Sequence, residues 1–237
     1  MPIREAIILA GGLGTRLRPA VPDLPKCLAP IDGKPFLFYL LEFLIEQGIH
    51  KFIFALSYKH ETLSRFLAGY KMDRAASYQL TIENEPLGTG GAVKLACSKA
   101  TEKTVLVVNG DTFFSIDLNL LSLAHAEKSA DCTLSLKPMR NFDRYGSVEL
   151  NPDNSVKCFQ EKKYYETGLI NGGVYALSVE KFKDQSFPEQ FSFERDYLEP
   201  LESNRVIYGL VQDVYFIDIG VPEDYARAQL ELPALVK

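Results

Sequence analysis

The sequence predicts an α/β protein in which a mostly parallel sheet lies between two layers of helices. Three observations support this: apolar runs alternate with helix-period segments through the first half, glycine-rich turns follow two of those runs directly, and the second half carries mainly short strand-like segments. The chain has 237 residues, 46% of them hydrophobic, enough for one substantial core. We expect a single domain over residues 1–237, with a first half of about 1–130 and a second half of about 131–237.

The first half supplies the parallel part of the predicted sheet. Residues 6–10 (AIILA) form a short apolar run that ends at Gly11-Gly12, as expected of a strand buried on both faces. Further strands are expected at 52–56, 78–82 and 105–108, and helices at 36–45, 61–67 and 92–99.

The second half is expected to extend this sheet in a mixed or antiparallel way, because few helices separate its strands. Strands are expected at 133–136, 147–150, 156–161, 172–177, 206–211 and 215–219, and helices at 193–201 and 222–230.

Composition excludes several classes of function. The net charge of −5 and the pI of about 5.4 disfavour a general nucleic-acid binder. The four cysteines include no CxxC pair, which disfavours a zinc site or a disulfide framework and suits a reducing cytoplasm. No apolar run approaches the length of a membrane span. We expect a cytoplasmic protein that binds neither nucleic acid nor membranes.

The turn after the first strand reads LAGGLGTRL, residues 9–17. Its three glycines let backbone N–H groups approach an anion, and Arg16 offers a fork of donors for phosphate oxygens. Leu17 stands where a dinucleotide-binding GxGxxG motif needs glycine, and the Gly-Lys-Ser/Thr of a P-loop is absent. By itself the pattern is equally compatible with an ordinary strand-to-helix turn. Lys26, shortly downstream, is a second candidate phosphate contact.

Acidic residues mark three further turns. Asp111 follows the apolar strand 105–108, and Asp218 lies within another apolar run. Two carboxylates meeting over a triphosphate are a usual way to hold Mg²⁺, although either residue alone could be a helix cap. In the segment ENEPLGTGG, Glu85 could accept both the N1–H and the N2 amino group of guanine, with the backbone of Gly88 beside it. A plain exposed acid before a proline turn is the alternative for Glu85.

The segment LAGGLGTRLRP, followed by Pro25-Lys26, resembles the signature of the sugar-1-phosphate nucleotidyltransferases. The resemblance implies a three-layer Rossmann-like nucleotidyltransferase fold with a small antiparallel sugar-binding extension. It implies that about residues 1–130 form the NTP-binding half and about residues 131–237 the sugar-phosphate-binding half. It also implies that a loop wraps the NTP phosphates and that Arg16 and Lys26 pair with them. The loop residues concerned are Leu9, Gly11, Gly12, Gly14 and Thr15. Cys27 stands where the family usually has proline.

The resemblance also assigns the sugar-phosphate and metal sites. It implies that Asp111 and Asp218 bind Mg²⁺, that Glu161 accepts sugar hydroxyls, that Lys162 holds the sugar 1-phosphate, and that Gly146 and Asn171 complete the sugar site. In the implied reaction, a sugar 1-phosphate oxygen attacks the α-phosphorus of the NTP and pyrophosphate leaves. The attacking oxygen is already anionic, so no general base is needed. The implied catalytic residues are Arg16, Lys26, Asp111 and Lys162.

Within this family, the motifs NGDTFFSIDL, NFDRYGSV, GLINGGVY, FSFE and YFIDIGVPEDY together resemble the D-glycero-α-D-manno-heptose 1-phosphate guanylyltransferases. GTP and a heptose 1-phosphate are therefore the expected substrates. Mannose, glucose or N-acetylmuramate 1-phosphate, with GTP or UTP, stay open as alternatives. A glycosyltransferase that uses a nucleotide sugar and a catalytically inactive ligand sensor are the rival classes. The partners expected are small molecules, and a homodimer is left open.

Overall fold

The computed structural model describes residues 2–12, 17, 21–22, 24–57, 60–70, 76–200 and 205–236. The strands in these ranges are β1 (Glu5–Leu9), β2 (Pro30–Ile31), β3 (Lys34–Pro35), β4 (Lys51–Leu56), β5 (Ser77–Ile82), β6 (Thr104–Asn109), β7 (Thr112–Phe114), β8 (Cys132–Phe142), β9 (Ser147–Leu150), β10 (Val156–Gln160), β11 (Tyr165–Ser178), β12 (Ile207–Val211) and β13 (Phe216–Asp218). The helices are α1 (Phe36–Glu46), α2 (His60–Gly69), α3 (Gly88–Cys97), α4 (Leu118–Glu127), α5 (Val179–Lys183) and α6 (Pro222–Leu235), with a 3₁₀ turn η1 (Lys26–Leu28) and a π-helical turn η2 (Phe193–Leu198).

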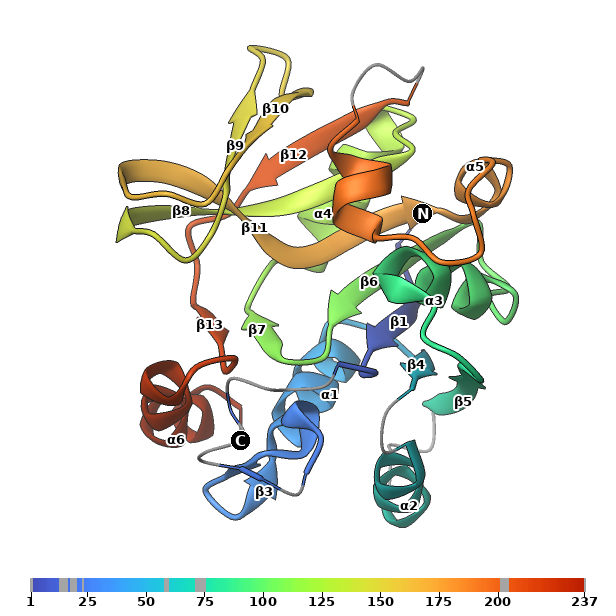
Figure 1. Ribbon diagram of the computed structural model, residues 1–237, viewed down its shortest axis with the longest axis vertical. Coiled ribbons are helices and arrows are strands. Elements are labelled where there is room, and N and C mark those ends of the chain that lie inside the picture. The colour runs from blue at the N-terminus through green and yellow to red at the C-terminus, as the bar shows by residue number, and fades with distance from the viewer. Residues whose placement is uncertain are drawn as a thin grey trace.

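One mixed sheet organises these elements. Its continuous path is β10-β9-β11-β6-β1-β4-β5, and β8 pairs with β11 and carries β12. Strands β6, β1, β4 and β5 are parallel, whereas β11 runs antiparallel to β6 and β8. The hairpin of β9 and β10 rises at the top of Figure 1, away from the parallel strands. The predicted fold class is confirmed, including the antiparallel extension.

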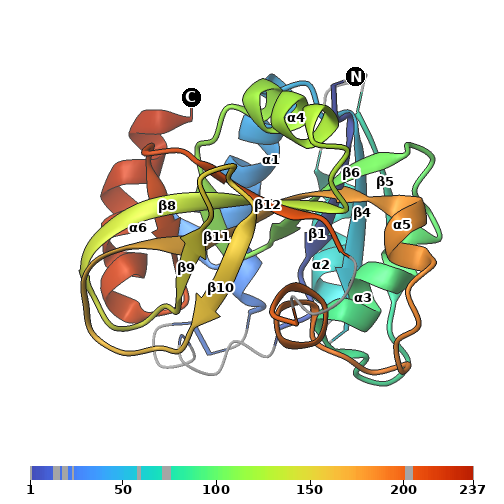
Figure 2. The same ribbon diagram turned by 90° about the horizontal axis from the view of Figure 1, so that it is seen from above.

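Neighbouring residues of the central strands face two different cores. Ile8 of β1 packs in the cluster around α1, α2, α4 and α6, whereas Ile7 packs in the cluster around α3, α5 and η2. Both side chains are fully buried, because a parallel sheet with helices on each face leaves neither face to solvent. Helices α1 and α3 accordingly lie on opposite sides of the parallel strands (Figure 1 and Figure 2).

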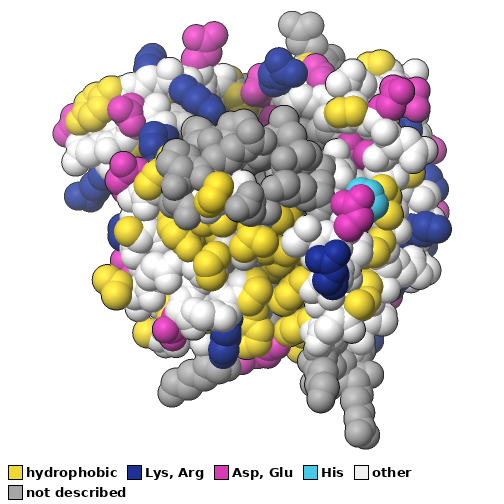
Figure 3. All heavy atoms as spheres, turned by 60° about the horizontal axis from the view of Figure 1, so that its bottom comes forward, with side chains coloured by type: hydrophobic (Ala, Val, Ile, Leu, Met, Phe, Trp, Pro, Cys, Tyr) yellow, Lys and Arg dark blue, Asp and Glu magenta, His cyan; other side chains and the backbone are white. Residues whose placement is uncertain are grey.

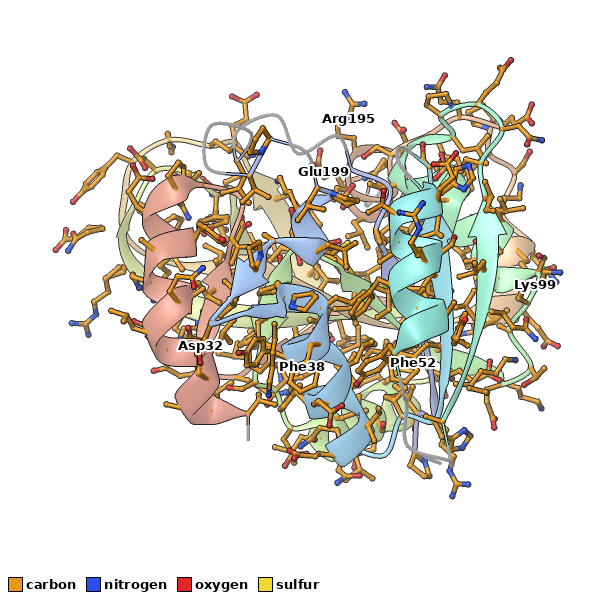
Figure 4. All side chains as sticks on the ribbon, turned by 90° about the horizontal axis from the view of Figure 1, so that it is seen from below. Asp32, Phe38, Phe52, Lys99, Arg195 and Glu199 are labelled. Carbon is orange, nitrogen blue, oxygen red and sulfur yellow. The ribbon has the colours of Figure 1, made fainter. Side chains whose placement is uncertain are left out.

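Figure 4 shows one core and part of the surface in the same view. Phe38 and Phe52 lie in the core region around α1. Arg195 lies within η2 and Glu199 lies just after it; both are exposed and lie at the opposite end of the view. On the face shown in Figure 3, hydrophobic side chains gather near the centre and Lys and Arg side chains lie singly around them. In the described parts of the chain, no helix is long and apolar enough to cross a membrane.

Several elements differ from the sequence prediction. Helix α3 starts at Gly88 rather than at residue 92, and the expected strand 172–177 is the end of the longer β11. The expected helix 193–201 is the shorter η2. Helices α4 and α5, the strand β7 and the β2–β3 hairpin were not predicted. The apolar residues of α4 (LNLLSLAHAE) are not confined to one face, so its period is weak, and its start depends on Asp117, which accepts from the backbone N–H of Asn119 and Leu120.

Candidate active site

The site begins where β1 and β6 end side by side. Leu9 is in register with Asn109, so the glycine turn after β1 and the Asn-Gly-Asp turn after β6 meet at the same edge of the sheet. The backbone N–H of Gly110 donates to the carbonyl of Leu9 at 2.9 Å, and a Cβ on Gly110 would lie 2.7 Å from that oxygen. Glycine is therefore required at position 110 for the two turns to approach each other.

A small two-stranded sheet brings the second acid to this edge. Strand β13 pairs with β7 so that Asp218 is in register with Thr112, and the backbone N–H of Ile219 donates to the carbonyl of Asp111 at 3.0 Å. Burial raises the pKa of Asp218, and the charge of Asp111 raises it further. Two acids separated by about half of the chain therefore lie next to each other.

Lys26 completes this charged group. Its Nζ lies 3.0 Å from Asp111 Oδ2, and a Cβ on Gly220 would lie 3.3 Å from the same Nζ and 2.7 Å from Asp218 Oδ1. Pro25 precedes the 3₁₀ turn that carries Lys26. The next residue, Cys27, is buried in the core, and burial together with the charge of Asp111 raises its thiol pKa to about 12. Cys27 is thus a neutral packing residue.

A cleft of about 430 Å³ opens beside Asp111. Its lining residues come from the end of β1 and its glycine turn, η1, the ends of β4 and β6, the loop between β5 and α3, the start of α3, and η2: Leu9, Ala10, Gly11, Gly12, Lys26, Cys27, Ala55, Ser57, Glu83, Pro86, Gly88, Thr89, Ala92, Asn109, Gly110, Asp111 and Glu194. The start of α3 is fixed against Phe191: the N–H of Gly90 donates to the Phe191 carbonyl at 2.9 Å, and a Cβ on Gly90 would lie 2.2 Å from the Phe191 ring.

The carboxylate that faces this cleft after β5 belongs to Glu83. Its Oε2 accepts from the backbone N–H of Leu87 at 2.8 Å, and burial raises its pKa. A Cβ on Gly11 would lie 3.6 Å from Glu83 Oε1, so this oxygen looks toward the glycine turn. Glu85 is exposed and is not part of the cleft lining, whereas Gly88 is. Sequence analysis selected Glu85, which lies outside the lining, and did not select Glu83, which is part of it.

A second, smaller pocket of about 170 Å³ adjoins the acids. Asp218, Lys162 and Asn171 line it, together with Arg144 and Tyr145. The Tyr145 hydroxyl lies 3.4 Å from Asp218 Oδ2 and accepts from Arg144 at 2.8 Å. Arg144 also forms an ion pair with Asp224. The structure thus places Lys162 and Asn171 near Asp218.

Two predicted sugar-site residues lie outside this lining. Glu161 is exposed, and its backbone carbonyl accepts from the Tyr165 hydroxyl at 2.9 Å. Gly146 faces the β9–β10 hairpin, where a Cβ would lie 2.5 Å from the carbonyl oxygen of Gln160. This close approach to the Gln160 backbone explains why glycine stands at position 146. The remaining predicted residues, Gly14, Thr15 and Arg16, lie outside the described residues.

The comparison with known families decides the class of enzyme. A profile of the family described as Nucleotidyl transferase matches residues 5–234. The chain belongs to this family. The predicted resemblance and the predicted enzyme class, a nucleotidyl transferase, are thereby confirmed.

Among nucleotidyl transferases, this chain is similar to two bacterial proteins over nearly its full length. The D-glycero-alpha-D-manno-heptose 1-phosphate guanylyltransferase of Aneurinibacillus thermoaerophilus is 49% identical, covering 96% of this chain and 98% of that protein. The enzyme of the same name from Campylobacter jejuni is 46% identical, covering 93% and 96%. The structure of HddC from Yersinia pseudotuberculosis complexed with GMP-PN has a TM-score of 0.85 and 38% identity, covering 96% of this chain and 98% of that one.

Glu194 ends the FSFE motif (residues 191–194) and lines the cleft of this nucleotidyl transferase, but sequence analysis gave it no individual role. Its Oε2 accepts from the hydroxyls of Thr89 at 2.7 Å and Ser192 at 3.1 Å. The packing of η2 on α3 brings Glu194 to the cleft. Asn109 and Glu83, by contrast, stand directly at strand ends, which is the signal that could have identified them.

Proposed function

We propose that this nucleotidyl transferase transfers GMP from GTP to D-glycero-α-D-manno-heptose 1-phosphate, giving the GDP-sugar and pyrophosphate. The proposal is supported by one feature above all: Asp111, Asp218 and Lys26 meet where the larger cleft and the smaller pocket adjoin. A nucleotide in the larger cleft and a sugar 1-phosphate in the smaller pocket would present their phosphates to each other at this point. The names of the two similar bacterial enzymes support the choice of GTP and the heptose.

The two carboxylates fit a magnesium ion. Mg²⁺ prefers hard oxygen ligands, and it usually takes one or two carboxylates and completes its shell with waters and substrate phosphates. Within the described residues, no group of three or more His, Cys, Asp and Glu side chains is placed to hold a metal ion. Asp111 and Asp218 would hold the ion, which when bound neutralises charge on the phosphates.

The protein groups act by positioning and by charge. An oxygen of the sugar 1-phosphate forms a bond to the α-phosphorus in line with the bond to the β-phosphate oxygen, which breaks and leaves with pyrophosphate. Lys162 holds the attacking phosphate, and Lys26 stabilises the negative charge of the triphosphate. Arg16 keeps its predicted role as a phosphate contact. The attacking oxygen is already ionised, so the chain needs no proton acceptor.

The histidines agree with this mechanism. His125 is buried, with ring nitrogens 3.0 Å from the hydroxyls of Thr133 and Ser178. Neither His50 nor His60 lines the two pockets described above. None of the three is positioned as a general base.

Glu83 is the residue that we propose reads guanine. Its free oxygen faces the cleft, and a carboxylate suits the adjacent N1–H and N2 donors of guanine. The four cysteines are free thiols, which supports the reducing cytoplasm as the place where the enzyme acts.

Pyrophosphate release tests the function directly. The purified protein with Mg²⁺ is given each of four NTPs with the heptose, mannose and glucose 1-phosphates. We expect the highest kcat/KM for GTP with the heptose 1-phosphate. Absence of pyrophosphate with every pair would contradict the proposed reaction, and a preference for another pair would replace the substrate assignment.

A further inference from the structure

Asn109 occupies a special place between the two pockets. It is the last residue of β6, directly before Gly110 and Asp111. Among the described residues, it is the one that lines both the larger cleft and the smaller pocket. Its side chain therefore stands at the passage through which the two substrates of the proposed reaction would meet.

The carboxamide of Asn109 has hydrogen-bonding groups to offer. Within the described parts of the chain, its side chain makes no hydrogen bond to protein, and the residue is half-buried. A carboxamide carries two N–H donors and one acceptor oxygen. Substrates that fill both pockets would remove water from this group, and a polar group deprived of water without a new partner is costly. A substrate bound across the two pockets would supply the hydrogen-bond partner of the Asn109 carboxamide.

The neighbouring strand is built to leave room for this side chain. Gly173 has a φ of +69°, and a Cβ there would lie 2.6 Å from Asn109 Nδ2. The turn at Gly173 is held by Asn171, whose Oδ1 accepts from the Gly173 N–H at 3.0 Å and whose Nδ2 donates to the Tyr175 hydroxyl at 2.9 Å. The amide of Asn171 is thus engaged within β11, while the amide of Asn109 is free.

We propose that Asn109 binds the hydroxyl on C2 of the sugar 1-phosphate and so selects sugars that carry it. The proposal rests on the proposed function. The anomeric phosphate must lie at the passage between the pockets in order to reach the α-phosphorus. The C2 hydroxyl is the hydroxyl nearest to the anomeric carbon, so it comes to the same place. Asn171 supports this arrangement by holding the turn that packs against Asn109.

The test compares the heptose 1-phosphate with its 2-deoxy analogue, using GTP and measuring kcat/KM. The variants are Asn109→Leu, which keeps the size of the side chain, and Asn109→Ala, which cannot clash with Gly173. The control is Asn119→Leu on the exposed surface of α4. We expect wild type and the control to prefer the hydroxylated sugar by about 10-fold or more, as for loss of one hydrogen bond in a binding site. Both Asn109 variants should lose this preference, and their loss of activity should be confined to the hydroxylated sugar.

Three results would overturn the inference. One is a wild type that uses both sugars equally well. Another is an equal loss of activity on both sugars in the Asn109 variants, which would make Asn109 a structural residue. The third is a wild type that releases no pyrophosphate with GTP and any sugar 1-phosphate. That result would refute the proposed function itself, whereas the first two leave it standing.

Discussion

The substitution Glu83→Gln tests how the nucleotide base is recognised. Glutamine has the shape of glutamate, and its one oxygen can still accept from the Leu87 N–H, now bonded to Oε2 at 2.8 Å. The amide nitrogen then takes the place of Oε1, which faces the cleft. The N1–H and N2 amino groups of guanine would meet another donor there, whereas uracil presents carbonyl oxygens beside its single N–H.

The size of the effect follows from the two losses combined. A hydrogen bond to a charged group contributes about 1.5–3 kcal/mol, and an unpaired donor costs about 1–3 kcal/mol. The cleft is open to solvent, so the lower end of both ranges applies, which gives about 2.5 kcal/mol, or about 70-fold in kcat/KM for GTP. Turnover of UTP should be unchanged or higher. The free energy of unfolding should change little, because the bond to Leu87 is kept.

The assay is pyrophosphate release with GTP and with UTP at a fixed concentration of sugar 1-phosphate. Glu85→Gln is the matched control, because Glu85 lies two residues away, is exposed, and undergoes the same change from carboxylate to amide. We expect its GTP-to-UTP ratio to equal that of wild type. An unchanged ratio in Glu83→Gln, or a changed ratio in Glu85→Gln, would refute the assignment of Glu83.

Three further predictions concern the acids, the packing of α3, and acid stability. Asp218→Asn should lower turnover by about 100-fold or more. It should not lower the melting temperature, because the raised pKa of Asp218 means that its charge is unfavourable in the folded state. Near-normal turnover at adequate Mg²⁺ would argue against Asp218 as a metal ligand. Gly90→Ala should destabilise the fold by about 1–3 kcal/mol, since its Cβ would lie 2.2 Å from the Phe191 ring. The control Gly69→Ala, in a helix with open space around the new Cβ, should stabilise by about 0.5–1 kcal/mol in chemical denaturation, and equal effects of the two would contradict this account. Burial lowers the pKa of His125 to about 4. As the pH falls from 6.5 to 4, the unfolded chain binds a proton at this residue that the folded chain does not bind. The free energy of unfolding should therefore fall by up to about 3 kcal/mol over this range, and His125→Gln should remove this part of the pH dependence.

The central strands and the order of motifs could be predicted from sequence because local patterns carry them. The run AIILA before two glycines predicts a buried strand and a turn from a short stretch of residues. The pairing of Asp111 with Asp218 has no local signal, since it depends on the register of β7 with β13. Resemblance to a family supplied that pairing, and the structure supplied its geometry.

The choice between neighbouring polar residues could not be made from sequence. Glu83 and Glu85 flank one asparagine, and only the return of the loop, with the Leu87 N–H on Glu83, decides which one faces the cleft. Asn109 and Asn171 pose the same problem. The turn that occupies Asn171 exists because β11 pairs with both β6 and β8 and its register shifts between Asn171 and Tyr175. Such long-range pairing is not written in any short stretch of residues.

The pairing of β7 with β13 also constrains when the enzyme can first work. The glycine turn, Lys26 and Asp111 belong to the first half of the chain, whereas Asp218 and the strand that positions it are synthesised well after them. A chain that is cut short before β13 therefore contains the first acid and lacks the second. Under the proposed function such a fragment cannot turn over its nucleotide, so catalysis begins only after β13 has been made and has paired with β7.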